Sequence, residues 1–274
     1  MTLDPSQNET WRRDSGGMVS RARGLRARLL DIAVPQRFVF HHVPKCGGTS
    51  VARALRKRCI LSQATVHPEA SFRAFEAFTG RHDRDAMLVD VLDLREQMLL
   101  YLMYTDTRCI AAHVGFSETA FARFAGHYKF VTVLREPVAR FLSHFAWSHG
   151  RHGAHAMIAE PFDAFLETPR AARMGASYVE YFSGLPDRHD LRSAAAIDRA
   201  VKGLHRFDVV GRLDDLARFR TDLKREIGLR PRIGHENRAR GPRAGLRPAD
   251  LTPEQLDRVR ALCTPDLAVW DAAP

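Results

Sequence analysis

Short apolar runs divide the chain and predict buried strands. They lie at residues 38–43, 108–116, 129–134 and 207–211. The run KFVTVL at 129–134 is nearly continuous, which is typical of a central strand in a parallel sheet. Between the runs, helix-forming composition and amphipathic spacing predict helices. The main ones lie at 51–55, 94–104, 138–148, 171–183, 213–227 and 253–263.

The order of these elements predicts the fold class. Strands alternate with helices, and the middle of the chain is helical, so we expect an α/β fold. Its P-loop-like central parallel β-sheet should be flanked by helices in three layers, α/β/α. A chain of 274 residues can bury one substantial core. We therefore expect a single domain at 36–274, preceded by a basic, partly disordered extension at 1–35.

The stretch RFVFHHVPKCGGTSVARAL at 37–55 carries the strongest chemical signal. Its apolar run ends at Pro44, and a cation, two adjacent glycines and two hydroxyls then stand directly before a predicted helix. Glycines let backbone N–H groups approach an oxyanion closely, and a helix N-terminus adds unpaired donors and its positive dipole end. Because Lys45 adds a full charge, this arrangement predicts a site for a phosphate or sulfate group.

The loop differs from the common nucleotide-binding patterns. In G-x-x-x-x-G-K-[ST] the lysine follows the second glycine, whereas Lys45 precedes Gly47, and G-x-G-x-x-G is absent. Cys46 lies within the loop, where a helix N-terminus and Lys45 would favour its thiolate. The alternative is that Cys46 is a small residue filling a tight loop.

Two further candidates follow predicted strands. Ligands of open α/β sheets bind at the carboxyl ends of the strands, so His113 faces the expected site, although a satisfied structural histidine fits the pattern as well. Arg135 leaves the strand at 129–134 close to a helix that has Pro137 in its first turn, and Ser143 lies about two turns further along. A guanidinium fork binds phosphate in two-pronged geometry, and a serine hydroxyl adds one donor.

These motifs resemble those of one known family. HVPKCGGTS at 42–50 is similar to the 5′-phosphosulfate-binding loop of sulfotransferases that use 3′-phosphoadenosine 5′-phosphosulfate (PAPS). LREPVARFLSHF at 134–145 is similar to their 3′-phosphate motif, R-x-P-x-x-R-x-x-S. The resemblance is closest to the carbohydrate branch, sulfotransferase family 2, which includes heparan- and chondroitin-sulfate sulfotransferases and soluble bacterial members. It implies the sulfotransferase fold and binding of PAPS by Lys45, Cys46, Gly47, Gly48, Thr49, Ser50, Arg135 and Ser143.

The resemblance also implies a reaction. HVGF at 113–116 is similar to the H-V-x-F segment of heparan sulfate 2-O-sulfotransferases, in which the matching histidine is the proposed base. It therefore implies Lys45 and His113 as catalytic residues. The implied reaction moves a sulfuryl group in line from PAPS to a hydroxyl of a carbohydrate or glycolipid acceptor, which can itself be anionic. On the acceptor side, only the Phe-Ser-Gly sequence at 182–184 matches the family pattern.

The charge pattern leaves two other interpretations open. The net charge is +10, and the excess is concentrated at 12–28 and 230–247. Arginine clusters of this kind suit a nucleic-acid-binding protein, but an anionic donor and acceptor explain them equally well, and we expect no nucleic-acid partner. An atypical nucleotide-dependent phosphotransferase is the second alternative, although the chain lacks a lysine after the glycines.

Location and metal binding are the remaining expectations. No apolar run approaches the roughly 20 residues needed to span a bilayer, and the N-terminus does not resemble a secretory signal, so we expect a cytoplasmic protein. Residues 20–32 could form a basic amphipathic helix that contacts a membrane surface or packs on the domain. The four cysteines form no C-x-x-C, and no acidic ligand is interleaved among His149, His152 and His155, so we expect no metal site.

Overall fold

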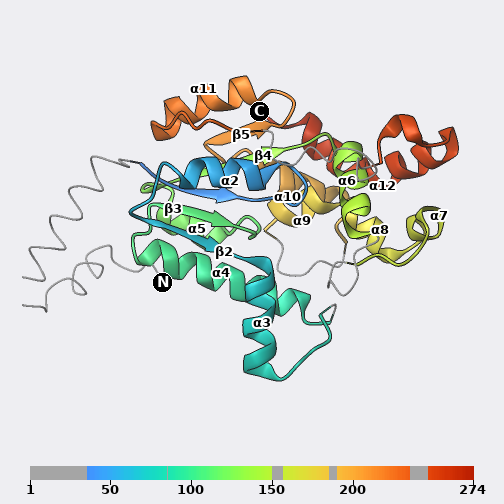
Figure 1. Cartoon of the computed structure of the whole chain (residues 1–274), viewed down its shortest axis with the longest axis horizontal. Helices are drawn as coiled ribbons and strands as arrows, with labels where there is room; N and C mark the ends of the chain where they lie inside the picture. The colour runs from blue at the N-terminus through green and yellow to red at the C-terminus, as the bar shows by residue number, and fades with distance from the viewer. Residues whose placement is uncertain (1–35, 85, 150–156, 185–189, 235–245) are drawn as a thin grey trace, which may run out of the picture.

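The computed structural model describes residues 36–84, 86–149, 157–184, 190–234 and 246–274 (Figure 1). The predicted extension at 1–35, with its candidate helix at 20–32, lies outside the described residues. Most of the arginine-rich segment at 230–247 does so as well.

Five parallel strands form one sheet in the order β2-β3-β1-β4-β5, so β1 lies in the middle between β3 and β4. Strand β1 is buried on both faces, because Phe38, Val39 and Phe40 have no exposed surface. It ends at His41, two residues before the end of the predicted run. The strands are β1 (Arg37–His41), β2 (Gln63–Val66), β3 (Cys109–Ala112), β4 (Tyr128–Leu134) and β5 (Val209–Arg212).

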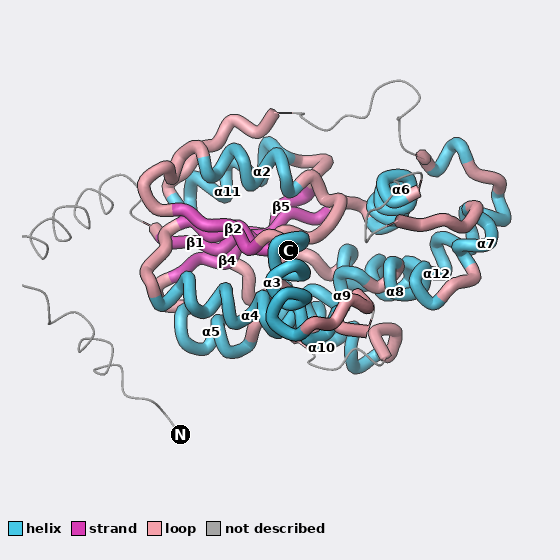
Figure 2. Tube along the Cα trace, turned by 60° about the horizontal axis from the view of Figure 1, so that its bottom comes forward, coloured by secondary structure: helices cyan, strands magenta, loops and turns pink. Residues whose placement is uncertain are grey.

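Helices cover both faces of the sheet, as Figure 2 shows. α2 (Gly48–Arg56) and α11 (Leu216–Ile227) lie over one face, and α4 (Leu88–Tyr104) and α5 (Glu118–Phe124) lie over the other. The predicted α/β fold with a central parallel sheet between helical layers is therefore confirmed. None of the described helices combines the length and the apolar character needed to cross a membrane. The other helices of this part are α3 (Pro68–Thr79), α9 (Ser177–Phe182) and α10 (Ala194–Leu204).

A further group of helices lies beyond the carboxyl ends of the strands (Figure 1). These helices enclose a separate hydrophobic cluster that includes Phe141, Phe165 and Cys263. Because α6 follows β4 after only two residues, this cluster stands next to the edge where ligands of parallel sheets bind. The helices are α6 (Pro137–Ser148), α7 (Phe162–Leu166), α8 (Pro169–Met174) and α12 (Pro253–Asp271).

Three helix predictions are wrong in extent. The helix predicted at 94–104 begins six residues earlier, at Leu88. The predicted helix at 171–183 is divided into α8 and α9, because the buried carboxylate of Asp266 accepts the backbone N–H of Tyr178 at 2.7 Å and so provides a new helix start. The helix predicted at 253–263 continues through Pro265 to Asp271. Proline removes one helical hydrogen bond there, but the guanidinium of Arg192 donates to the carbonyls of residues 261 and 262, each at 2.8 Å.

Candidate functional site

The loop between β1 and α2 has the backbone shape of an anion-binding site. Lys45 and Gly47 both adopt left-handed conformations, with φ of 66° and 72°, and α2 begins at Gly48 without a side-chain cap. Within the part of the chain that the structure describes, the N–H groups of Gly47, Gly48 and Thr49 donate no hydrogen bond. Successive N–H groups of this kind, at a helix N-terminus, form a concave site for an oxyanion.

Gly48 has to be glycine because a histidine ring lies against it. A Cβ atom at Gly48 would lie 2.1 Å from Cδ2 of His42. The His42 ring in turn contacts the ring of His113, with 3.9 Å between their centroids. His113 directly follows β3, so the loop after β1 and the predicted base meet through His42. The sequence analysis did not single out His42, although a polar residue between a strand end and Pro44 was a usable signal.

Both rings are held in their neutral form. The pKa of His42 is lowered to about 4 by burial and by the nearby charges of Lys45 and Arg56. The pKa of His113 is lowered well below its usual 6.5, mainly by burial and then by His42 and Arg95, while a hydrogen bond to the backbone of His42 opposes the shift. A neutral imidazole can accept a proton at physiological pH.

Two predicted cations meet at this edge of the sheet. Arg135 follows β4, and its Nη1 lies 3.5 Å from the backbone carbonyl oxygen of Lys45. The Nζ of Lys45 lies 4.9 Å from the centroid of the Trp147 ring, which α6 supplies. Arg135 is half-buried, and this burial lowers the pKa of its guanidinium. A bound anion would stabilise both charges.

The interpretation of Cys46 as a reactive thiolate is not supported. Its side chain is fully buried, with Sγ 3.5 Å from the hydroxyl oxygen of Tyr178, and burial raises the pKa of the thiol. The alternative interpretation of Cys46 as a small residue in a tight loop agrees with this packing. Its side chain is turned to the protein interior, so only its backbone could contribute to anion binding.

The predicted hydroxyl groups differ in exposure. Thr49 is exposed, whereas Ser50 is 8% exposed and donates its backbone N–H to the carbonyl oxygen of Gly47 at 3.1 Å. Ser143 is half-buried on α6. Its hydroxyl makes no hydrogen bond to the described residues, so it could serve a ligand.

Arg140, the second arginine of the R-x-P-x-x-R-x-x-S pattern, has a structural contact. It is completely buried, and its Nη2 lies 3.3 Å from a carboxylate oxygen of Asp266, which is also completely buried. The same guanidinium donates to the backbone carbonyl of Met174. Arg140 thus joins α6 to α12 and the end of α8, inside the protein.

Tyr178 is a buried residue that the sequence analysis did not identify. Its hydroxyl accepts the backbone N–H of Arg135 at 2.8 Å and donates to the carbonyl of the same residue. No local motif marks Tyr178, because its partners are supplied by the segment after β4 and by the loop after β1.

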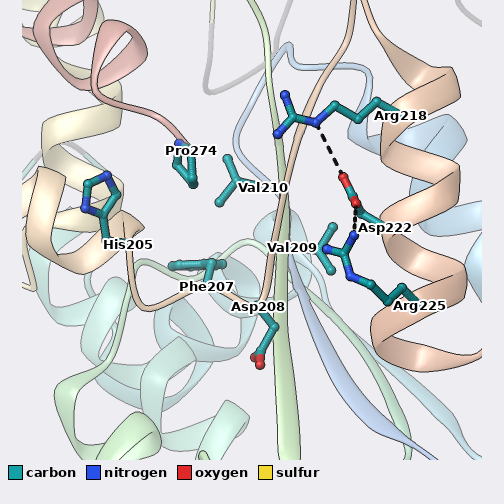
Figure 3. Close-up of a pocket in the computed structure, with 9 residues that line it drawn as sticks. All are labelled: His205, Phe207, Asp208, Val209, Val210, Arg218, Asp222, Arg225 and Pro274. Carbon is teal, nitrogen blue, oxygen red and sulfur yellow. Dashed lines mark hydrogen bonds and ion pairs between the residues drawn. The ribbon is translucent and has the colours of Figure 1, made fainter.

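A pocket of about 540 Å³ lies elsewhere, at the edge strand β5 (Figure 3). Val209 and Val210 line it together with α11, where the guanidinium of Arg225 lies 2.7 Å from the carboxylate of Asp222. None of the predicted site residues line it. In the described ranges no three His, Cys, Asp or Glu side chains are grouped so that they could hold a metal ion. His152 and His155 lie outside those ranges.

Comparison with known proteins gives one distant relative. The chain is 29% identical over 136 residues to heparan-sulfate 6-O-sulfotransferase 2 of mouse (Mus musculus). The match covers 49% of this chain and 22% of that protein, so the chain spans a minor part of the relative's length. No known protein-family model matches the chain. The similarity supports a distant sulfotransferase relationship.

Proposed function

We propose that the protein is a sulfotransferase that moves a sulfuryl group from PAPS to a hydroxyl of a carbohydrate acceptor. The observation that carries the proposal is the loop after β1. There the N–H groups of Gly47, Gly48 and Thr49, at the start of α2, donate no hydrogen bond to the described residues, and Lys45 precedes them in the loop. The similarity to a mouse sulfotransferase favours sulfuryl transfer over phosphoryl transfer.

The two ends of the donor would be bound by the segments that follow two neighbouring strands. The loop N–H groups and Lys45 would bind the 5′-phosphosulfate and stabilise the negative charge that grows on the leaving 5′-phosphate. Arg135, with Ser143 on the following helix, would bind the 3′-phosphate. Strands β1 and β4 are adjacent and parallel, so their carboxyl ends bring the two groups to the same edge of the sheet.

His113 would be the base. The sulfur–oxygen bond to the 5′-phosphate breaks, a bond from sulfur to the acceptor oxygen forms, and the proton of the acceptor hydroxyl passes to the imidazole. Its lowered pKa leaves His113 deprotonated before the reaction. An incoming anion beside the ring would raise that pKa and improve the base.

A carbohydrate is the acceptor class that we propose. The name of the mouse relative gives heparan sulfate as its substrate. The net charge of +10 on the present chain would favour an acceptor that already carries acidic groups.

The test is a transfer assay with PAPS and a series of polysaccharides that differ in charge, read as the formation of adenosine 3′,5′-bisphosphate (PAP). Lys45→Ala and His113→Ala should each lower turnover by at least about 100-fold. His113→Ala should bind PAP with nearly unchanged affinity, since the ring acts on the acceptor. His127→Ala, an exposed histidine at the opposite end of the sheet, is the matched control.

Near wild-type turnover in His113→Ala would show that the base is a different group. Phosphate transfer from ATP with Mg²⁺, in place of sulfuryl transfer, would replace the proposal by a phosphotransferase.

A further inference from the structure

The hydroxyl of Tyr178 touches both halves of the proposed donor site. It accepts the backbone N–H of Arg135 at 2.8 Å and donates to the carbonyl of that residue. It also lies 3.5 Å from Sγ of Cys46, in the loop after β1. One buried oxygen atom therefore contacts the segment proposed for the 5′ end of the donor and the segment proposed for its 3′ end.

Both segments have left the sheet at this point. The ladder between β1 and β4 runs from the pair Arg37 and Tyr128 to the pair His41 and Thr132. Lys45 and Arg135 lie beyond its last pair, so the regular pairing of the strands no longer sets their separation. Contacts outside the ladder have to do so.

Tyr178 is itself held firmly. Its backbone N–H donates to the Asp266 carboxylate at 2.7 Å, and that carboxylate is paired with Arg140 at 3.3 Å. The guanidinium of Arg140 also lies over the tyrosine ring, 5.5 Å from its centroid. All three side chains are completely buried. A phenol fixed in this way can impose its position on the two segments that it touches.

We infer that Tyr178 is a positioning residue that fixes the spacing between the 5′ loop and Arg135, and so selects donors that carry phosphate at both ends. This inference rests on the proposed function. A rigid ligand with two phosphates gains from both sites only if their separation matches its own. A displacement of about 1 Å removes much of that gain.

The experiment compares three ligands by calorimetric titration: PAP, 5′-AMP and 3′-AMP. Tyr178→Phe keeps the ring and removes the oxygen. We expect the affinity for PAP to fall about tenfold, because the backbone of Arg135 loses both of its hydrogen bonds to the hydroxyl of Tyr178 and moves. Each monophosphate uses one segment alone, so its affinity should change less than about twofold. If Tyr178 only stabilised the fold, the substitution would change the affinities for the three ligands by the same factor.

Tyr128→Phe is the matched control. Its hydroxyl is also buried and donates to a backbone carbonyl, that of Thr107, at 2.9 Å, but it lies at the amino end of β4. Tyr128→Phe should lower the thermal stability about as much as Tyr178→Phe does. It should leave the affinities for PAP, 5′-AMP and 3′-AMP unchanged.

Cys46→Ala repeats the test from the loop, because it removes the thiol contact to the hydroxyl of Tyr178, together with a weak thiol contact to the carbonyl of Pro44 at 3.7 Å. If Tyr178→Phe does not fold, Cys46→Ala takes its place in the experiment. The loss of affinity should again be larger for PAP than for either monophosphate. Unchanged PAP affinity in the folded variants, or an equal loss for all three ligands, would overturn the inference. A folded wild-type protein that binds no PAP would instead refute the proposed function.

Discussion

Gly48 is the position where one added methyl group should disturb the chemistry most directly. In Gly48→Ala the new Cβ would lie 2.1 Å from Cδ2 of His42, whereas ordinary contacts begin near 3.4 Å, so the ring has to move by about 1.3 Å. That ring cannot simply rotate away, because it is in contact with His113 at 3.9 Å between centroids. The substitution should therefore displace the proposed base.

The energies estimated for Gly48→Ala predict a loss of activity and no gain in stability. Alanine in place of glycine in the first turn of α2 could stabilise the helix by up to about 1 kcal/mol. Overpacking costs about 1–3 kcal/mol, so the net effect should be a loss of about 0–3 kcal/mol. A displacement of about 1 Å at a reacting group can lower turnover about 100-fold. A domain of ordinary stability stays folded after such a loss, so turnover should fall because the proposed base is displaced and not because the protein unfolds.

The assay measures turnover with PAPS and unfolding by urea, side by side. Gly126→Ala is the control, because no atom lies within 4 Å of a Cβ at that glycine and its φ is not positive. It should behave as the wild type. If Gly48→Ala keeps turnover within about threefold of wild type, the link from the loop through His42 to His113 is not part of the mechanism.

Two further predictions concern buried titratable groups. The pKa of His41 is lowered to about 4 by burial, and that of His42 is lowered to the same value. The unfolded chain then binds more protons between pH 6.5 and about 4. The contribution of His41 to the free energy of unfolding should be constant above pH 6.5 and fall as the pH drops through that window, by up to about 3 kcal/mol. Urea unfolding of the wild type and of His41→Gln at pH 7.5 and pH 5 tests this: the wild type should lose stability relative to the variant at pH 5, and an unchanged difference between the two proteins would contradict it. Because all four cysteines are buried and burial raises the pKa of Cys46, the native protein should react slowly with a thiol reagent and release four equivalents only in denaturant. Rapid labelling of Cys46 in the native protein would contradict the packing described here.

The sequence alone was sufficient to predict those strands and site residues whose pattern lies within one short segment. The nearly continuous apolar run at 129–134 and the run at 38–43 identified β4 and β1, because strands buried on both faces carry apolar residues at most positions. The position of Arg135 at a strand end followed from the run at 129–134, and that of His113 followed from the run at 108–116. Since strands of a parallel sheet end at one edge, the candidates were expected together, and the contact between Arg135 and the loop at Lys45 agrees with this.

The remainder depended on contacts between distant parts of the chain. The division between α8 and α9 is set by Asp266, which comes from α12. The continuation of α12 through Pro265 depends on Arg192, whose guanidinium binds the neighbouring carbonyls. Tyr178 meets Arg135 across 43 positions of sequence. Neither composition nor spacing carries information on such pairs, because each partner looks ordinary in its own segment.

The proposed donor site is tested most directly by titrating PAP into the wild-type protein and into Arg135→Ala. Wild type should bind PAP and respond little to ATP with Mg²⁺, since ATP has no 3′-phosphate. Loss of a charged hydrogen-bonding partner should weaken PAP binding at least about tenfold in Arg135→Ala. Arg123→Ala, an exposed arginine on α5, should bind PAP as the wild type does. A folded wild-type protein that binds no PAP, or an Arg135→Ala variant with unchanged affinity, would contradict the account.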